Sequence, residues 1–68
     1  MEIGKKIREL RELRHWTREE LAKQTTLAID TISKLELGKT KHPNNYTIGV
    51  LEQTFGLAPN TLKELMEE

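Results

Sequence analysis

The feature that most constrains the fold is a pair of short helical segments between Trp16 and Lys39, separated by only a few residues. Thr17 precedes Glu20 by three residues, the spacing of a capping box at the start of a helix. A second apolar series ends at Gly38, and glycine readily adopts the left-handed backbone that follows a helix C-terminus. Helices this short need partners to bury their apolar faces. The flanking segments must therefore supply further helices.

Both flanking segments have the pattern of helices. Apolar residues recur at helical spacing over residues 3–14, which predicts an amphipathic first helix. On the other side, Asn44 can cap a fourth helix that runs to about Phe55 and stops at Gly56. The central pair is thus expected to lie between two longer helices.

The C-terminal part adds a last helix to this arrangement. Pro59 fits the first position of a fifth helix that continues to the C-terminus. Gly49, inside the fourth helix, costs about 1 kcal/mol of helix stability relative to alanine. Its presence there predicts close backbone packing. The sequence therefore predicts a single domain over residues 1–68, an all-α fold in which five helices form a compact bundle.

Composition excludes several function classes. The chain has no cysteine, so it has no disulfide framework and no thiolate metal site. Its two histidines are isolated, and we expect neither a metal nor another cofactor. No apolar run approaches the roughly 18 residues of a membrane-spanning helix, which favours a cytoplasmic protein with no membrane partner. No nucleophile, base and carboxylate lie at spacings that indicate an enzyme.

The net charge is zero, but the charges are unevenly distributed. Up to His42 there are ten Lys and Arg residues against seven Asp and Glu residues; after it there is one against four. This asymmetry indicates a basic binding half and an acidic distal half.

Four segments in chain order carry a family resemblance: IRELR, TREELAK, TISKLELGKTKHP and FGLAPNTL. With them, the chain resembles the helix-turn-helix domains of the lambdoid phage repressor and Cro family, also called the xenobiotic-response-element type. The likeness runs from Ile3 to Leu65. It implies a bundle of the lambda-repressor type and a sequence-specific transcriptional regulator, such as a repressor, that binds a palindromic operator in double-stranded DNA as a homodimer. A second protein or a C-terminal sensor domain is a further candidate partner.

The resemblance also implies roles for individual residues. It places the third helix, about residues 28–36, in the major groove. Base contacts are implied for Ala28, Ile29, Asp30, Ser33 and Lys34. Phosphate contacts are implied for Thr17, Arg18, Lys39, Thr40, Lys41 and His42, together with backbone amides of the loop that holds the last four. Arg11, which lies near the inward stripe of the first helix, is implied to form a partly buried ion pair with Glu36.

The chain departs from the family pattern at several of these positions. His15 and Thr26 stand where the family usually has glycine, so either the backbone there is left-handed and strained or the turns differ. Ala28 replaces a Ser or Thr cap, which removes an interaction of about 1 kcal/mol. The base-reading positions hold Ile29 and Asp30 rather than Gln, Asn or Arg.

These last two residues leave two interpretations open. Ile29 matches a thymine methyl group and Asp30 can accept from a cytosine amino group. Alternatively, Asp30 only interacts with the helix dipole, and an exposed Ile29 belongs to a protein-interaction module of the same fold, such as an antitoxin-like partner with weak or no DNA binding. A dimer contact is expected in the region of the fourth and fifth helices, where an exposed Leu57, Leu62 or Met66 could serve.

Overall fold

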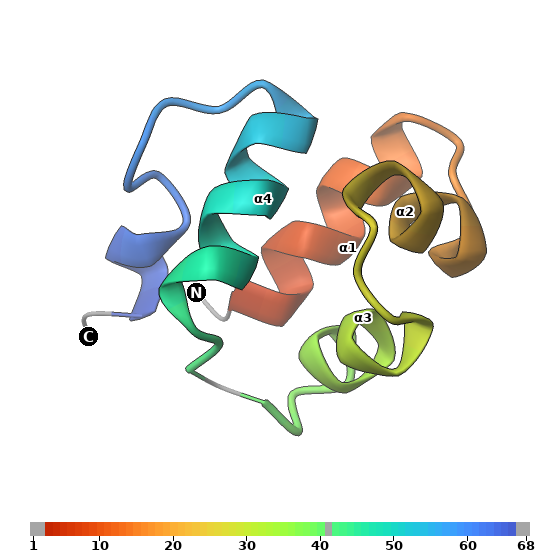
Figure 1. The fold of residues 1–68 in the computed structure, drawn as a ribbon, viewed down its shortest axis with the longest axis horizontal. Helices are drawn as coiled ribbons and strands as arrows, with labels where there is room; N and C mark the ends of the chain where they lie inside the picture. Colours follow the sequence, from red (N-terminus) through yellow and green to blue (C-terminus); the bar gives the residue numbers. More distant parts are fainter. Residues whose placement is uncertain (1–2, 41, 67–68) are drawn as a thin grey trace.

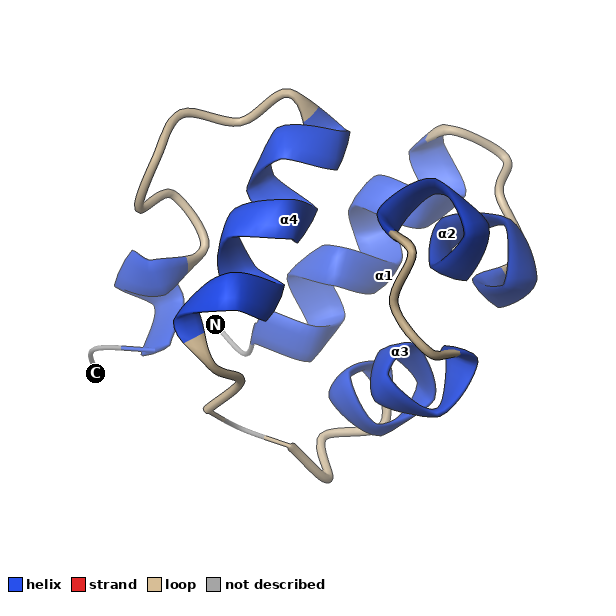
Figure 2. Cartoon of the chain, in the orientation of Figure 1, coloured by secondary structure: helices blue, strands red, loops and turns tan. Residues whose placement is uncertain are grey.

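The computed structural model describes residues 3–40 and 42–66. Within these ranges the chain forms four α-helices and one 3-10 helix, joined by short loops (Figure 1). The elements are α1 (Ile3–Leu13), α2 (Arg18–Thr25), α3 (Ile29–Glu36), α4 (Asn45–Phe55) and the 3-10 helix η1 (Lys63–Met66). All regular secondary structure in the described ranges is helical (Figure 2), so the predicted all-α class is confirmed.

The helices pack around one apolar core. α1 packs on α3, and α2 packs on both α3 and α4. Each helix contributes apolar side chains at intervals of three or four residues, because that spacing places them on one face. The buried apolar residues are Ile3, Ile7, Leu10, Leu21, Ile32, Leu35, Ile48, Leu51, Phe55 and Leu62.

The helix ends follow the local signals in the sequence. The Thr17 hydroxyl oxygen accepts from the Glu20 amide at 3.1 Å, which caps α2. Asn44 caps α4 in the same way, since its side-chain oxygen accepts from the Thr47 amide at 2.9 Å. Gly56 ends α4 in the left-handed conformation, with φ of 70°. These caps place α2 and α4 within about one residue of the predicted positions.

The connection between α1 and α2 is held against the end of α4. The rings of Trp16 and Phe55 are stacked with their centroids 6.2 Å apart. The Arg14 guanidinium lies over both rings, at 5.6 Å from Trp16 and 5.1 Å from Phe55. It also donates to the Phe55 carbonyl oxygen at 2.8 Å, where a cation interacts well with a helix C-terminus. Trp16 is therefore a packing residue.

The predicted fifth α-helix is wrong. Residues 59–62 form turns, and only the four-residue 3-10 helix η1 follows them. Asn60 has φ of 73°, in the left-handed region, and this interrupts the run of right-handed residues that a helix beginning at Pro59 would need. The Leu62 amide donates instead to the buried carboxylate of Glu52 at 2.9 Å, which holds the segment against α4.

This arrangement changes the candidates for a dimer contact. Leu62 is fully buried, with 0% of its surface exposed, so its assignment to an exposed contact is wrong. Leu57 is half-buried and packs against the core. The side chain of Met66 lies outside the described part of the chain. The expectation of close backbone packing at Gly49 is also wrong, because a Cβ there would meet no atom within 4 Å.

Candidate nucleic-acid interface

The turn between α2 and α3 uses a left-handed residue that is not glycine. Thr26 has φ of 58° and ends α2. The buried Thr25 hydroxyl supports the turn from inside, since it donates to the Leu21 carbonyl at 2.8 Å and accepts from the Leu27 amide at 3.3 Å. His15, after α1, likewise has φ of 57°. Of the two alternatives from the sequence, the chain adopts the strained left-handed backbone at both positions.

α3 has one buried and one open face. Ile32 and Leu35 are completely buried in the core. The residues implied to read bases lie on the rest of the helix surface: Ala28, Ile29, Asp30 and Lys34 are exposed and Ser33 is half-buried. Ala28 occupies the N-cap position and makes no side-chain cap, as its methyl group dictates. The fold thus leaves one side of α3 available to a partner.

Two apolar residues stand on this open face. Ile29 is 41% exposed and Leu37, the C-cap of α3, is 59% exposed. Leu37 was not among the residues predicted from the sequence, although it follows Ser33 by one helical turn and Asp30 by two, which places the three on one side of α3. The open face therefore ends in an apolar side chain that the family resemblance did not imply.

A charged cluster joins the first three helices. Arg11 Nε donates to Glu36 Oε2 at 2.7 Å and its Nη2 donates to Oε1 at 3.0 Å, a two-bond pair between α1 and the end of α3. Arg11 Nη1 also donates to the Trp16 carbonyl at 2.7 Å. The hydrogen bond from Glu36 raises the pKa of Arg11 above its ordinary value, against the opposing effect of burial. The Glu36 carboxylate is completely buried and so needs these donors.

Arg18 is part of the same cluster. Its Nε donates to Glu36 Oε1 at 3.1 Å, from the first residue of α2. The side chain remains 34% exposed, whereas that of Arg11 is 12% exposed. Thr17, the other candidate at this helix end, uses its hydroxyl to cap α2. The Arg18 ion pair was not predicted, because spacing along the chain does not show which helix ends meet.

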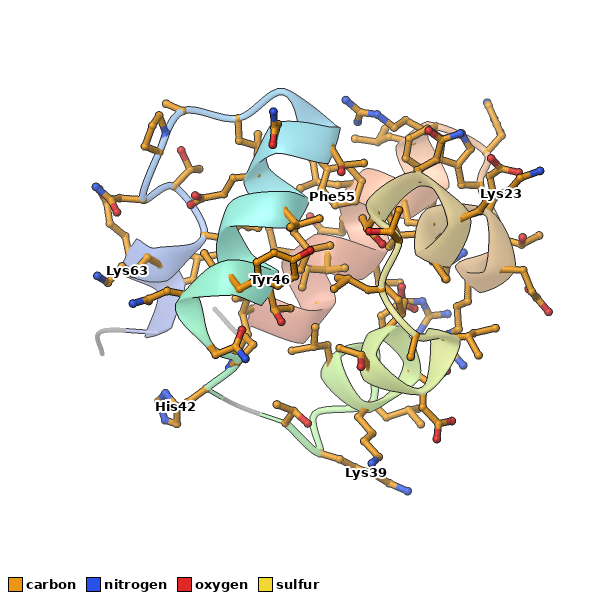
Figure 3. All side chains as sticks on the ribbon, in the orientation of Figure 1. Lys23, Lys39, His42, Tyr46, Phe55 and Lys63 are labelled. Carbon is orange, nitrogen blue, oxygen red and sulfur yellow. The ribbon has the colours of Figure 1, made fainter. Side chains whose placement is uncertain are left out.

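The loop after α3 carries the remaining candidates. Lys39 and His42 are exposed, and Figure 3 shows both side chains directed outward from the connection to α4. Thr40 is half-buried, and Lys41 lies outside the described residues. The amides of Lys39 and Thr40 both donate to the Lys34 carbonyl, at 2.8 and 3.2 Å. These two amides therefore complete the C-terminus of α3, and the predicted use of loop amides for phosphates does not extend to them.

The described residues give little support for a metal site or a membrane-spanning helix. In residues 3–40 and 42–66 no three His, Asp or Glu side chains are grouped so that they could hold a metal ion. No helix in those ranges is both long enough and apolar enough to cross a membrane. On α3 and in the loop after it, Lys34, Lys39 and His42 are exposed.

Comparison with known proteins agrees with this geometry. A family model described as "Helix-turn-helix domain" matches residues 4–68. The chain belongs to the helix-turn-helix domain family. Neither the curated proteins nor the solved structures contain a significant match to it. In this helix-turn-helix domain the two short helices α2 and α3 pack on each other, and they also pack on α4 and α1, respectively.

Proposed function

We propose that this helix-turn-helix domain is a sequence-specific, double-stranded DNA-binding transcriptional regulator of the lambdoid repressor and Cro type. It acts as a repressor, binds a palindromic operator as a homodimer, and has no enzymatic activity. Its place of action is the cytoplasm, together with its DNA target. In this proposal α3 enters the major groove, and the groups at the start of α2 and in the loop after α3 contact the DNA backbone.

The open face of α3 is the observation that carries the proposal. Ile32 and Leu35 anchor the helix in the core, so the opposite side projects from the domain with Asp30 and Lys34 exposed on it. A rigid helix with one free face is the element that helix-turn-helix proteins place in the major groove. Lys34 supplies a cation suited to guanine, and Ile29 an apolar group suited to a thymine methyl.

Charge near the C-terminal end of α3 supports the same orientation. Arg18 lies at the N-terminus of α2, and Lys39 and His42 lie in the loop after α3. These side chains are expected to contact phosphates, which orients the domain without reading sequence. In a two-fold dimer the two copies of α3 would lie roughly 34 Å apart, one turn of the duplex.

A second candidate function rests on the apolar residues of the open face. Ile29 and Leu37 are 41% and 59% exposed, and the chain has no net positive charge. An α3 surface of this kind also suits a protein partner, as in an antitoxin-like module with weak DNA binding. Affinity that comes from charged contacts to phosphates falls steeply with salt concentration, whereas affinity that comes from apolar protein contacts does not. The salt dependence of binding therefore distinguishes the two functions.

Selection from a random duplex library tests the proposal. The protein is used to enrich duplexes at about 50 and 200 mM salt, and the recovered sequences are examined for two-fold symmetry. We expect a palindromic motif and at least a roughly tenfold loss of affinity between the two salt concentrations. Absence of enrichment by a folded, helical protein would contradict DNA recognition and favour the protein-interaction function.

A further inference from the structure

Arg11 and Arg18 share one carboxylate but use different parts of their guanidinium groups. Arg11 donates through all three nitrogens, to Glu36 from Nε and Nη2 and to the Trp16 carbonyl from Nη1. Arg18 donates to Glu36 through Nε alone. Within the described ranges the structure assigns no protein acceptor to either Nη group of Arg18. Its outer edge is therefore available to a ligand.

The cluster keeps a positive charge at that edge. Two guanidinium groups meet one carboxylate, so one charge remains uncompensated. Arg11 is 12% exposed and Glu36 is fully buried, which makes Arg11 the enclosed partner of the carboxylate. Arg18, at 34% exposure, presents the surplus charge to solvent. Without Arg11, the carboxylate would cancel the charge of Arg18 instead.

We propose that Glu36 is a positioning residue for DNA binding, which holds Nε of Arg18 so that both Nη groups face one backbone phosphate. The inference rests on the function proposed above and adds a mechanism to it. Because a guanidinium is planar, fixing its Nε side on a carboxylate leaves the opposite edge with two parallel N–H donors. A phosphate accepts from such an edge through two oxygens, and the side chain has already been ordered before DNA arrives.

The arrangement also links phosphate binding to the placement of α3. Glu36 is the last residue of α3 and Arg18 is the first residue of α2. A phosphate held by Arg18 is therefore placed relative to both helices of the motif through a single carboxylate. Lysine cannot reproduce this, since its ammonium has no fixed second edge and cannot serve Glu36 and a phosphate in the same geometry.

A charge-conserving exchange tests the proposal. Arg18→Lys is compared with Arg8→Lys, because Arg8 also donates through Nε to a carboxylate, that of Glu12 at 3.2 Å, but both side chains of that pair are more than half exposed. Affinities for the selected duplex are measured over a range of salt concentrations. We expect Arg18→Lys to lose at least fivefold in affinity, while the slope of log affinity against log salt concentration stays nearly unchanged. The affinity of Arg8→Lys should stay within twofold of that of the wild type.

A second measurement uses the unmodified protein and does not depend on the folding of a variant. Proton–nitrogen NMR follows the side-chain Nε–H and Nη–H signals of Arg18 as the selected duplex is added. We expect the Nε–H signal to keep its shift and slow exchange, because Glu36 retains that bond, while the Nη–H signals move. Release of the Nε–H on DNA binding would overturn the proposal, as it would show that Arg18 leaves Glu36 to meet the phosphate.

The outcomes separate this inference from the function on which it rests. If the wild type enriches no duplex, both the function and the inference are overturned. If the wild type binds a palindromic motif and Arg18→Lys binds it equally well, DNA recognition stands and only the positioning role of Glu36 is overturned.

Discussion

Gly4 of α1 lies directly against the backbone of Leu35 in α3. A Cβ at Gly4 would overlap the Leu35 carbonyl oxygen and stand 2.9 Å from its carbonyl carbon. The two helices therefore meet through their backbones at this point, and only glycine allows that approach. The contact brings the C-terminal part of α3 onto α1, where Glu36 pairs with Arg11.

Gly4→Ala should consequently destabilise the fold. We expect the free energy of unfolding to fall by about 1 to 3 kcal/mol, since α1 and α3 must separate to admit a methyl group. Gly49→Ala is the matched control, because Gly49 also lies within a helix but is exposed and open. That change should raise the free energy of unfolding by about 0.5 to 1 kcal/mol. Urea denaturation measures both, and equal stabilities for the two variants would contradict the backbone contact.

Glycine should be favourable at the two strained turns. His15 and Thr26 have φ of 57° and 58°, a conformation that is costly for residues with a Cβ and most so for a β-branched one. We expect His15→Gly and Thr26→Gly each to raise the free energy of unfolding by about 0.5 to 1 kcal/mol, after the larger backbone entropy of glycine is subtracted. Asn60→Gly, at φ of 73°, should gain less because asparagine tolerates this region. Thermal unfolding measures how much each of the three substitutions changes the stability of the fold.

The missing cap of α3 can be restored. Ala28 has φ of −66° and ψ of 143°, the extended backbone of an N-cap residue, but no side-chain acceptor. Ala28→Ser should therefore stabilise the fold by about 1 kcal/mol. Thr17→Ala removes the existing cap of α2 and should cost a similar amount. If Ala28→Ser left chemical denaturation unchanged, the N-cap geometry described for α3 would be incorrect.

The buried Glu52 should be essential to the packing of the C-terminal segment. Its carboxylate accepts from the Leu62 amide at 2.9 Å, and Glu52 itself is only 7% exposed. Glu52→Leu leaves that amide without an acceptor, and we expect a loss of about 1 to 3 kcal/mol. Glu52→Gln keeps an acceptor oxygen and should lose less. Hydrogen exchange at the Leu62 amide reports the contact directly and should accelerate far more in the leucine variant.

Two lysines should differ in how they contribute to DNA binding. Lys34 is exposed on α3, whereas Lys39 belongs to the following loop. If Lys34 reads a base, Lys34→Ala weakens specific binding by about 1 to 3 kcal/mol and relaxes preference at one base pair. Lys39→Ala should weaken binding to all sequences nearly alike and reduce the salt slope by about 1. Equal losses on every duplex for Lys34→Ala would remove that residue from base recognition.

Short-range signals in the sequence were sufficient for most of the helices. Thr17 and Asn44 cap through amides three residues ahead, and Gly56 ends α4 through its own backbone freedom. Such interactions lie within one helical turn, so the order of residues alone determines them. The last segment is the exception. Pro59 favours a helix there, but Asn60 has left-handed backbone and the Leu62 amide donates to Glu52 of α4.

What the sequence by itself determined is the all-α class, the two short central helices and the residue types available on α3. Only the tertiary structure decided which glycine is crowded, which carboxylate is buried and which arginines share Glu36. Gly4 lies in the first turn of α1 and Gly49 inside α4, and only Gly4 has another helix packed against it. These contacts join residues far apart in the chain, and their distances depend on how the helices cross, which no local spacing specifies.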